Sequence, residues 1–186
     1  MAIKVEKQGI GSVNVVLFDS SDWGDVEQDI VTRSELRSCI ETASKDVSDI
    51  LELSEHLNIT CRPVWDELSD TLGVSGYTED SEMVKLTFYY KYSAGKEALL
   101  KLLRETVFHE LNHAARFGAV EYSEYMLGAV VSEGLATVFE RDYADSRPAY
   151  GDYEGEPVDE WFRELDQPDM RNYHDYFFWH NDGRHW

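Results

Sequence analysis

Hydrophobic residues that recur at spacings of three and four predict three main helices. The first begins at Thr32 and continues to about Leu53, the second covers 94–117, and the third covers 123–143. A short further helix is predicted for 158–165. The predicted core positions of the first two helices are Leu36, Ile40, Ala43, Val47, Ile50, Leu51, Leu99, Leu102, Leu103, Thr106 and Phe108.

Residues with capping preferences mark the ends of these helices. Thr32 is followed three residues later by Glu35, which is the spacing of a capping box. Ser93 is a suitable N-cap for the second helix. Gly118 is predicted to end that helix, because glycine adopts the left-handed conformation of a helix C-terminus without steric strain.

Three short runs predict strands, at 12–19, 57–64 and 83–92. The third is the clearest, because apolar and polar residues alternate along it and place Val84, Leu86, Phe88 and Tyr90 on one face. Residues 73–81 contain two glycines and end in T-E-D-S, which predicts a loop. Together the elements predict an α+β fold with a small mixed or antiparallel sheet.

The composition predicts one acidic domain over 1–186, because no repeat or linker divides the chain. The 17 basic and 37 acidic residues give a net charge of −20. Nucleic acid and anionic membranes are therefore not expected as partners, since both bind cationic patches. No apolar leader or membrane span is evident, which predicts a cytoplasmic protein. The oligomeric state is left open.

Cys39 and Cys61 are the only cysteines in the chain. One falls in the first predicted helix and the other in a predicted strand, and neither belongs to a C-x-x-C pair. Two buried thiols in a reducing compartment are therefore expected, rather than a disulfide.

The second predicted helix contains the run His109-Glu110-Leu111-Asn112-His113, which is an H-E-x-x-H pattern. A helix turns about 100° per residue, so the two imidazoles lie about 40° apart on one face and can bind one metal ion. Glu110 is turned about a quarter of the way round the helix, which places it beside the ion. The pattern therefore predicts a zinc site with a carboxylate base.

A catalytic zinc needs a third protein ligand and an open position for water. A histidine six residues after His113 would be one solution, but Ala119 stands there. Glu133 in the third helix is the better candidate, because it shares a stripe with apolar and small residues, where an unpaired carboxylate is unfavourable. Gly134 beside it would allow a close approach of another helix. The rival ligands are Glu121, Glu124 and Glu140.

The runs H-E-L-N-H and S-E-G-L-A-T resemble the gluzincin branch of the zincin metallopeptidases. Within that branch, the chain is most similar to a microbial family of predicted zinc-dependent proteases of otherwise unknown function. The resemblance implies a zincin-like fold, one Zn²⁺ per chain on His109, His113 and Glu133, and Glu110 as the general base. It also implies a C-terminal segment beyond Trp186. One departure is Thr137, where better-known gluzincins often carry an aspartate.

The expected activity is zinc-dependent hydrolysis of a peptide or protein substrate. A zinc-bound water, activated by Glu110, would attack the scissile carbonyl. The strand at 83–92 is interpreted either as a sheet edge that pairs with an extended peptide or as an ordinary half-exposed strand. Candidate donors to the developing oxyanion, chosen by composition, are Tyr173, His174, Tyr176, His180 and His185.

Three alternative functions fit parts of the pattern. The first is a catalytically idle zinc-binding or interaction domain that keeps the zincin fold. The second is a di-iron carboxylate bundle, which needs a second E-x-x-H, whereas Glu140 is followed by Tyr143. The third is a peptide deformylase-like site, for which Cys61 would be the upstream cysteine ligand.

Overall fold

The structure is a computed structural model that describes residues 13–17, 30–64, 72–120, 126–148, 157, 159–160 and 163. It has a mixed α+β architecture, as expected, and the chain forms two compact units, 1–119 and 120–186. The expectation of a single domain over 1–186 stays a prediction. Most of the predicted short helix at 158–165 lies outside the described residues.

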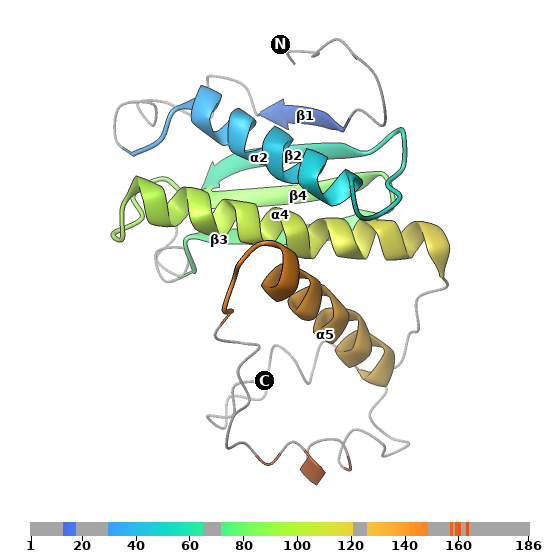
Figure 1. The fold of residues 1–186 in the computed structure, drawn as a ribbon. Helices are drawn as coiled ribbons and strands as arrows, with labels where there is room; N and C mark the ends of the chain where they lie inside the picture. Colours follow the sequence, from blue (N-terminus) through green and yellow to red (C-terminus); the bar gives the residue numbers. More distant parts are fainter. Residues whose placement is uncertain are drawn as a thin grey trace. The chain divides into compact units, whose positions relative to one another are not determined.

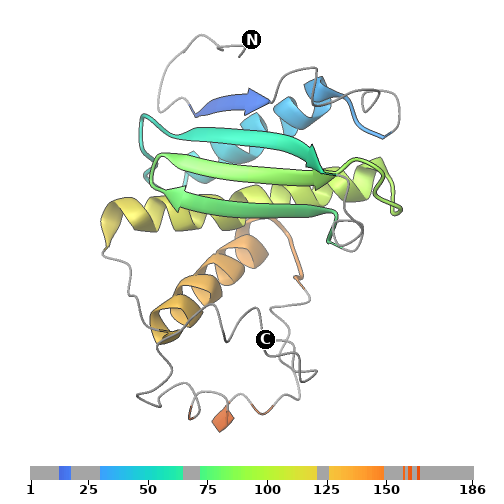
Figure 2. The same ribbon diagram turned by 180° about the vertical axis from the view of Figure 1, so that it is seen from behind.

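The first unit contains a four-stranded mixed sheet in the order β1-β2-β4-β3. Its strands are β1 (Asn14–Leu17), β2 (Asn58–Val64), β3 (Val74–Asp80) and β4 (Met83–Tyr89). β2 pairs in parallel with β1 and β4, and β3 pairs antiparallel with β4. Figures 1 and 2 show that two helices, α2 (Arg33–Ser48) and α4 (Lys96–Ala119), cover one face of this sheet.

β3 was not expected, because the two glycines before T-E-D-S indicated a loop. Of these two glycines, Gly76 lies inside the strand, and Gly73 precedes it in a left-handed conformation with φ of 71°. In the strand order, β3 is an edge strand of the described sheet. β4 lies between β2 and β3, so the interpretation of 83–92 as a sheet edge is wrong. β4 also ends at Tyr89, because the chain turns there and Tyr92 N–H donates to the Tyr89 carbonyl.

The sheet residues beneath the helices form rows that run across all four strands. One row contains Val15, Ile59, Val84 and Thr78, and the next contains Leu17, Cys61, Leu86 and Gly76. The members of both rows on β1, β2 and β4 are buried and apolar. The rows change character only at β3, where a hydroxyl and a glycine replace the apolar side chains. A register irregularity follows between Thr78 and Asp80.

Helix α2 confirms the predicted capping box. Thr32 Oγ1 accepts from the Glu35 N–H at 3.2 Å, and Glu35 Oε2 accepts from the Thr32 N–H at 2.8 Å. The helix ends earlier than predicted, at Ser48, with Asp49 as its C-cap. The last two predicted core positions of this helix, Ile50 and Leu51, lie in the turn that follows it. Ile50 is 44% exposed. The four earlier positions on this helix are fully buried.

Glu35 gives the first testable prediction. Hydrogen bonds from the backbone of Thr32 and from the Lys96 side chain lower the pKa of Glu35 from 4.5 to about 2. A depressed folded-state pKa stabilises the protein above the unfolded value and loses that effect as the pH falls through the folded value. Wild type should therefore melt at a higher temperature than Glu35→Gln at pH 7, and the difference should vanish between pH 4.5 and about 2.

Glu41 supplies the control for this measurement. It is exposed on the same helix and forms only a 3.6 Å ion pair with Arg37. Glu41→Gln should shift the melting temperature little at any pH. A pH-independent difference between wild type and Glu35→Gln would contradict the role of the ionised carboxylate.

Helix α4 is the long helix that carries the H-E-x-x-H run. It begins at Lys96, and the Gly95 carbonyl accepts from the Leu99 N–H, so the prediction of Ser93 as the N-cap is wrong. Gly118 lies within the last turn and does not end the helix. The predicted core positions Leu99, Leu103 and Phe108 are buried.

The second unit contains helix α5 (Met126–Tyr143), which covers most of the predicted third helix. Its buried side chains are Ser132, Ala136, Phe139 and Glu140. The sequence placed Val130, Glu133 and Thr137 on one stripe of this helix, but these three residues are only partly buried. At the end of the helix, Asp145 has φ of 55°, and the Ser146 hydroxyl donates to Glu140 Oε1 at 2.8 Å.

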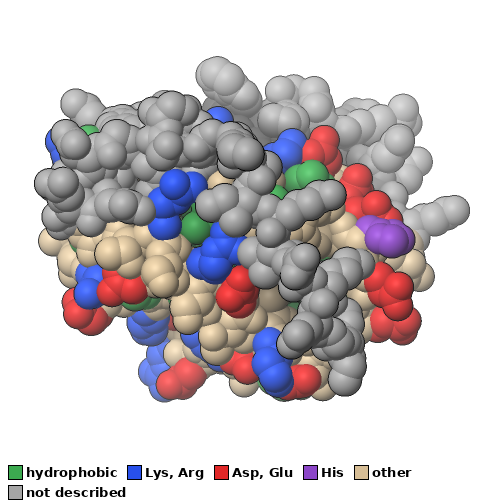
Figure 3. Space-filling model, turned by 90° about the horizontal axis from the view of Figure 1, so that it is seen from above, with side chains coloured by type: hydrophobic (Ala, Val, Ile, Leu, Met, Phe, Trp, Pro, Cys, Tyr) green, Lys and Arg blue, Asp and Glu red, His purple; other side chains and the backbone are tan. Residues whose placement is uncertain are grey.

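Charged side chains of both signs are interspersed on the face of the molecule drawn in Figure 3. Asp and Glu side chains gather around the histidine on the right of this view, and the whole chain has a net charge of −20. Among the described helices, none combines the length and the apolar character needed to cross a bilayer.

Candidate metal centre

The two histidines of the H-E-x-x-H run lie on one face of α4. Their ring centroids are 5.0 Å apart, and the ring planes meet at 64°. His113 is buried and His109 is partly buried. The helical spacing of four residues produces this arrangement directly, as the sequence predicted.

Glu133 of α5 completes a group that could hold a metal ion. One potential ligand atom from each of His109, His113 and Glu133 lies within 4.8 Å of the other two. Two imidazole nitrogens and one carboxylate oxygen form the His₂Glu donor set of catalytic zinc sites, which leaves one coordination position open. The chemistry of the three residues therefore fits the ion that was predicted.

Glu110 follows His109 in α4, is buried, and contacts β3. The Thr78 hydroxyl lies 2.7 Å from Glu110 Oε2 and 2.9 Å from the Glu110 backbone carbonyl oxygen. Thr78 is itself only 8% exposed and Glu110 only 7%. Glu110 is not part of the group of potential metal ligands.

Gly76 makes room for the Glu110 side chain. A Cβ atom at position 76 would lie 2.5 Å from Glu110 Oε1 and 2.6 Å from Glu110 Cδ. Real Cβ atoms essentially never approach other heavy atoms so closely, so any side chain at this position must displace the carboxyl group. The backbone of β3 therefore lies directly against the predicted base.

The rival glutamate ligands do not join the group in the described part of the chain. Glu140 is 1% exposed, and its carboxylate accepts from Ser146 instead. Glu121 and Glu124 lie outside the described residues. The di-iron alternative needs a second E-x-x-H, and Glu140, which lacks the histidine three residues later, does not join the described ligand group.

Cys61 does not fit the deformylase-like alternative. It is fully buried in β2, and desolvation raises the pKa of its thiol to about 12. Among the described residues, Cys61 does not join His109 and His113 in the group that could hold a metal ion. Both cysteines are free thiols, as expected, but only Cys61 is buried, and Cys39 is partly buried.

Gly134 does not have the packing role expected from the sequence. A Cβ atom at this position would meet nothing within 4 Å. Gly134→Ala should therefore raise the free energy of unfolding by about 0.5–1 kcal/mol, because alanine is preferred to glycine inside a helix. Urea unfolding would measure the change. A destabilised variant would mean that the position lacks the space that the structure gives it.

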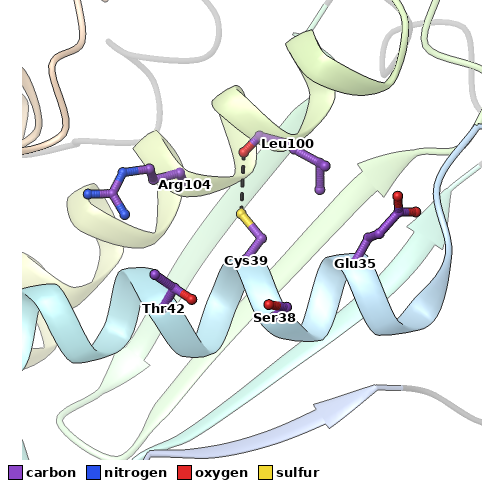
Figure 4. A pocket seen from close by; sticks show the side chains of 6 residues that line it. All are labelled: Glu35, Ser38, Cys39, Thr42, Leu100 and Arg104. Atoms are coloured by element: carbon purple, nitrogen blue, oxygen red, sulfur yellow. Dashed lines mark hydrogen bonds between the residues drawn. The ribbon is translucent and has the colours of Figure 1, made fainter.

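A shallow cavity of about 380 Å³ lies between α2 and α4, as Figure 4 shows. Two of the polar side chains that line it have partners: the Cys39 thiol donates to the Leu100 carbonyl at 3.4 Å, and Arg104 forms a 2.8 Å ion pair with Asp46. Burial raises the pKa of Cys39, which makes it a poor nucleophile. The cavity is not the candidate site.

Sequence reasoning missed Thr78 and Gly76, the two β3 residues that contact Glu110. A signal was present, since exposed Ser75, Tyr77 and Glu79 alternate with the more buried residues of β3. This alternation was not recognised in the sequence, because Gly76 occupies one of the inward positions and has no apolar side chain. The candidate oxyanion donors at 173–185 lie outside the described residues.

Comparison of the chain with protein-family models, curated proteins and solved structures finds no match. The function is therefore inferred from the arrangement of the chain's own residues.

Proposed function

We propose that this protein is a zinc-dependent peptide hydrolase with a zincin-like fold of the gluzincin type. His109, His113 and Glu133 would hold one zinc ion, and Glu110 would act as the general base. The observation that carries the proposal is the grouping of these three ligand atoms within 4.8 Å, and the buried Glu110 directly follows His109 in the same helix.

When bound, zinc lowers the pKa of a coordinated water towards neutrality and polarises a carbonyl group. The Glu110 carboxylate then takes a proton from the attacking water at one of its oxygens. It returns that proton to the nitrogen of the departing amine as the C–N bond breaks. One carboxyl group that serves as base and then as acid suits amide hydrolysis, in which the leaving amine must be protonated.

The position of β3 supports a peptide as the substrate. Within the described sheet, β3 pairs only with β4, so its other edge presents backbone N–H and C=O groups. An extended peptide would bind along this edge through backbone hydrogen bonds, with little demand on its sequence. Because β3 contacts Glu110 directly through Thr78, a peptide on this edge would pass close to the base.

Metal analysis combined with a peptide-library digest tests the proposal. The purified protein should contain one zinc per chain and cleave a subset of peptides, as detected by mass spectrometry. A chelator should stop cleavage, and added zinc should restore it.

Two results would point elsewhere. Two irons per chain would favour the carboxylate bundle. One tightly bound zinc without cleavage of any library peptide would favour the idle zinc-binding domain.

A further inference from the structure

We propose that Thr78 is a positioning residue that holds the Glu110 carboxylate in one orientation, and that Gly76 leaves the space which this orientation needs. Thr78 and Gly76 together are called the Glu110 seat. The role assigned to Glu110 rests on the proposed function. The seat itself rests only on contacts between β3 and α4.

The sheet rows beneath the helices show that these two residues depart from an otherwise apolar pattern. In one row Val15, Ile59 and Val84 are almost completely buried, and Thr78 ends it. A buried hydroxyl is unfavourable unless it is hydrogen-bonded, and a valine would continue the row without that requirement. The acceptors that satisfy the Thr78 hydroxyl both belong to Glu110.

The geometry of the hydroxyl favours one conformation of the Glu110 side chain. Thr78 Oγ1 has one proton and two acceptors, Oε2 at 2.7 Å and the backbone oxygen at 2.9 Å. Because threonine is β-branched, its side chain has few rotamers and its hydroxyl has a fixed position above the strand. A flexible glutamate is thereby tied to a rigid strand at its carboxylate, while the same hydroxyl contacts its backbone.

Gly76 lies against the other oxygen of the Glu110 carboxylate, Oε1. The place of a Cβ at this position is occupied by Oε1 and Cδ of Glu110. Gly76 and Thr78 are two residues apart on β3 and so face the same side of the strand. One oxygen of Glu110 therefore lies over Gly76, and the other is held by Thr78.

The consequence for catalysis is preorganisation. A base that must take a proton from one bound water works best when its carboxylate already points at that water. Releasing the carboxylate should lower kcat and leave zinc binding and KM largely unchanged, because neither depends on the orientation of Glu110.

Thr78→Val and Thr78→Ser test this role as a matched pair. Valine keeps the shape and removes the hydroxyl, whereas serine keeps the hydroxyl. We expect Thr78→Val to lower kcat roughly 10–100-fold, the range seen when a partner that orients a functional side chain is lost. Thr78→Ser should recover most of the loss, and both variants should bind one zinc per chain.

Crystal structures of the two variants provide a readout that does not depend on activity. The Glu110 carboxylate should leave its wild-type rotamer in Thr78→Val and keep it in Thr78→Ser. An unchanged rotamer in Thr78→Val, or equal kcat values in wild type and Thr78→Val, would overturn the proposal. If wild type cleaves no peptide, the proposed function fails, and the rotamer still decides whether Thr78 positions Glu110.

Gly76→Ala tests whether Glu110 needs the space above Gly76, and Gly118→Ala is the control. A Cβ at position 118 would lie 3.7 Å from the nearest side-chain atom, which is ordinary contact. Gly76→Ala should displace Glu110 and lower kcat at least as much as Thr78→Val. Gly118→Ala should keep wild-type kcat. Equal kcat values for Gly76→Ala and wild type would contradict the seat.

Discussion

Replacing Glu110 by glutamine should leave zinc bound and remove nearly all peptide hydrolysis. Glutamine has almost the same shape and keeps a carbonyl oxygen that can accept from Thr78, so the fold around β3 should survive. The amide cannot take a proton from water at neutral pH. General base catalysis contributes roughly 10²–10⁴-fold, and kcat should fall by about that factor. Zinc content and peptide cleavage, measured on the same preparation, check both halves of the prediction.

Glu105 offers a matched control on the same helix. It is also buried, at 8% exposure, and it forms an ion pair with Lys101 at 3.5 Å. Glu105 lies outside the metal-ligand group, so Glu105→Gln should keep both zinc and turnover. A fully active Glu110→Gln would remove Glu110 from the mechanism.

Replacing Glu133 by alanine should abolish tight zinc binding. This change removes one of three protein ligands, a larger perturbation than the loss of a residue that only orients a ligand. The latter typically costs 10–100-fold in affinity, so we expect a loss greater than about 100-fold. A competition titration against a chelating dye would measure it.

Thermal unfolding gives an independent measure of the same site. A ligand at about 100 times its Kd stabilises the native state by about 2.7 kcal/mol. Added zinc should therefore raise the melting temperature of metal-free wild type and have little effect on Glu133→Ala. Asp142→Asn is the control, because Asp142 is exposed on the same helix and pairs with Arg141. Unchanged zinc affinity in Glu133→Ala would end the three-ligand model.

Local patterns predicted the helical part of the candidate site. His109 and His113 are brought together by helix periodicity alone, which is a property of neighbouring residues. The capping box at Thr32 is also local, and it was predicted correctly. Glu133 was predicted because the sequence placed it on a mostly apolar stripe. It does belong to the group that could hold a metal ion, but it is only partly buried, so the reasoning from the stripe did not hold.

The parts that sequence reasoning missed depend on contacts between distant segments. Gly76 looks like a turn residue, and its contact with Glu110 joins residues that lie 34 positions apart in the chain (110 minus 76). The early end of α2 is a different case. Ile50 and Leu51 continue the apolar spacing past the last helical residue, so the pattern alone could not show where the helix stops.

The pairing of β3 with β4 is irregular between Thr78 and Asp80, and this bears on insertions and deletions in the two strands. Neighbouring strand residues face opposite sides, so one residue inserted or deleted nearby must be absorbed at this irregularity or must reverse the faces of β3. After such a reversal, Tyr77 or Glu79 would stand beneath Glu110 in place of the hydroxyl. The spacing of residues in the hairpin thus matters to the candidate base as much as their identity does.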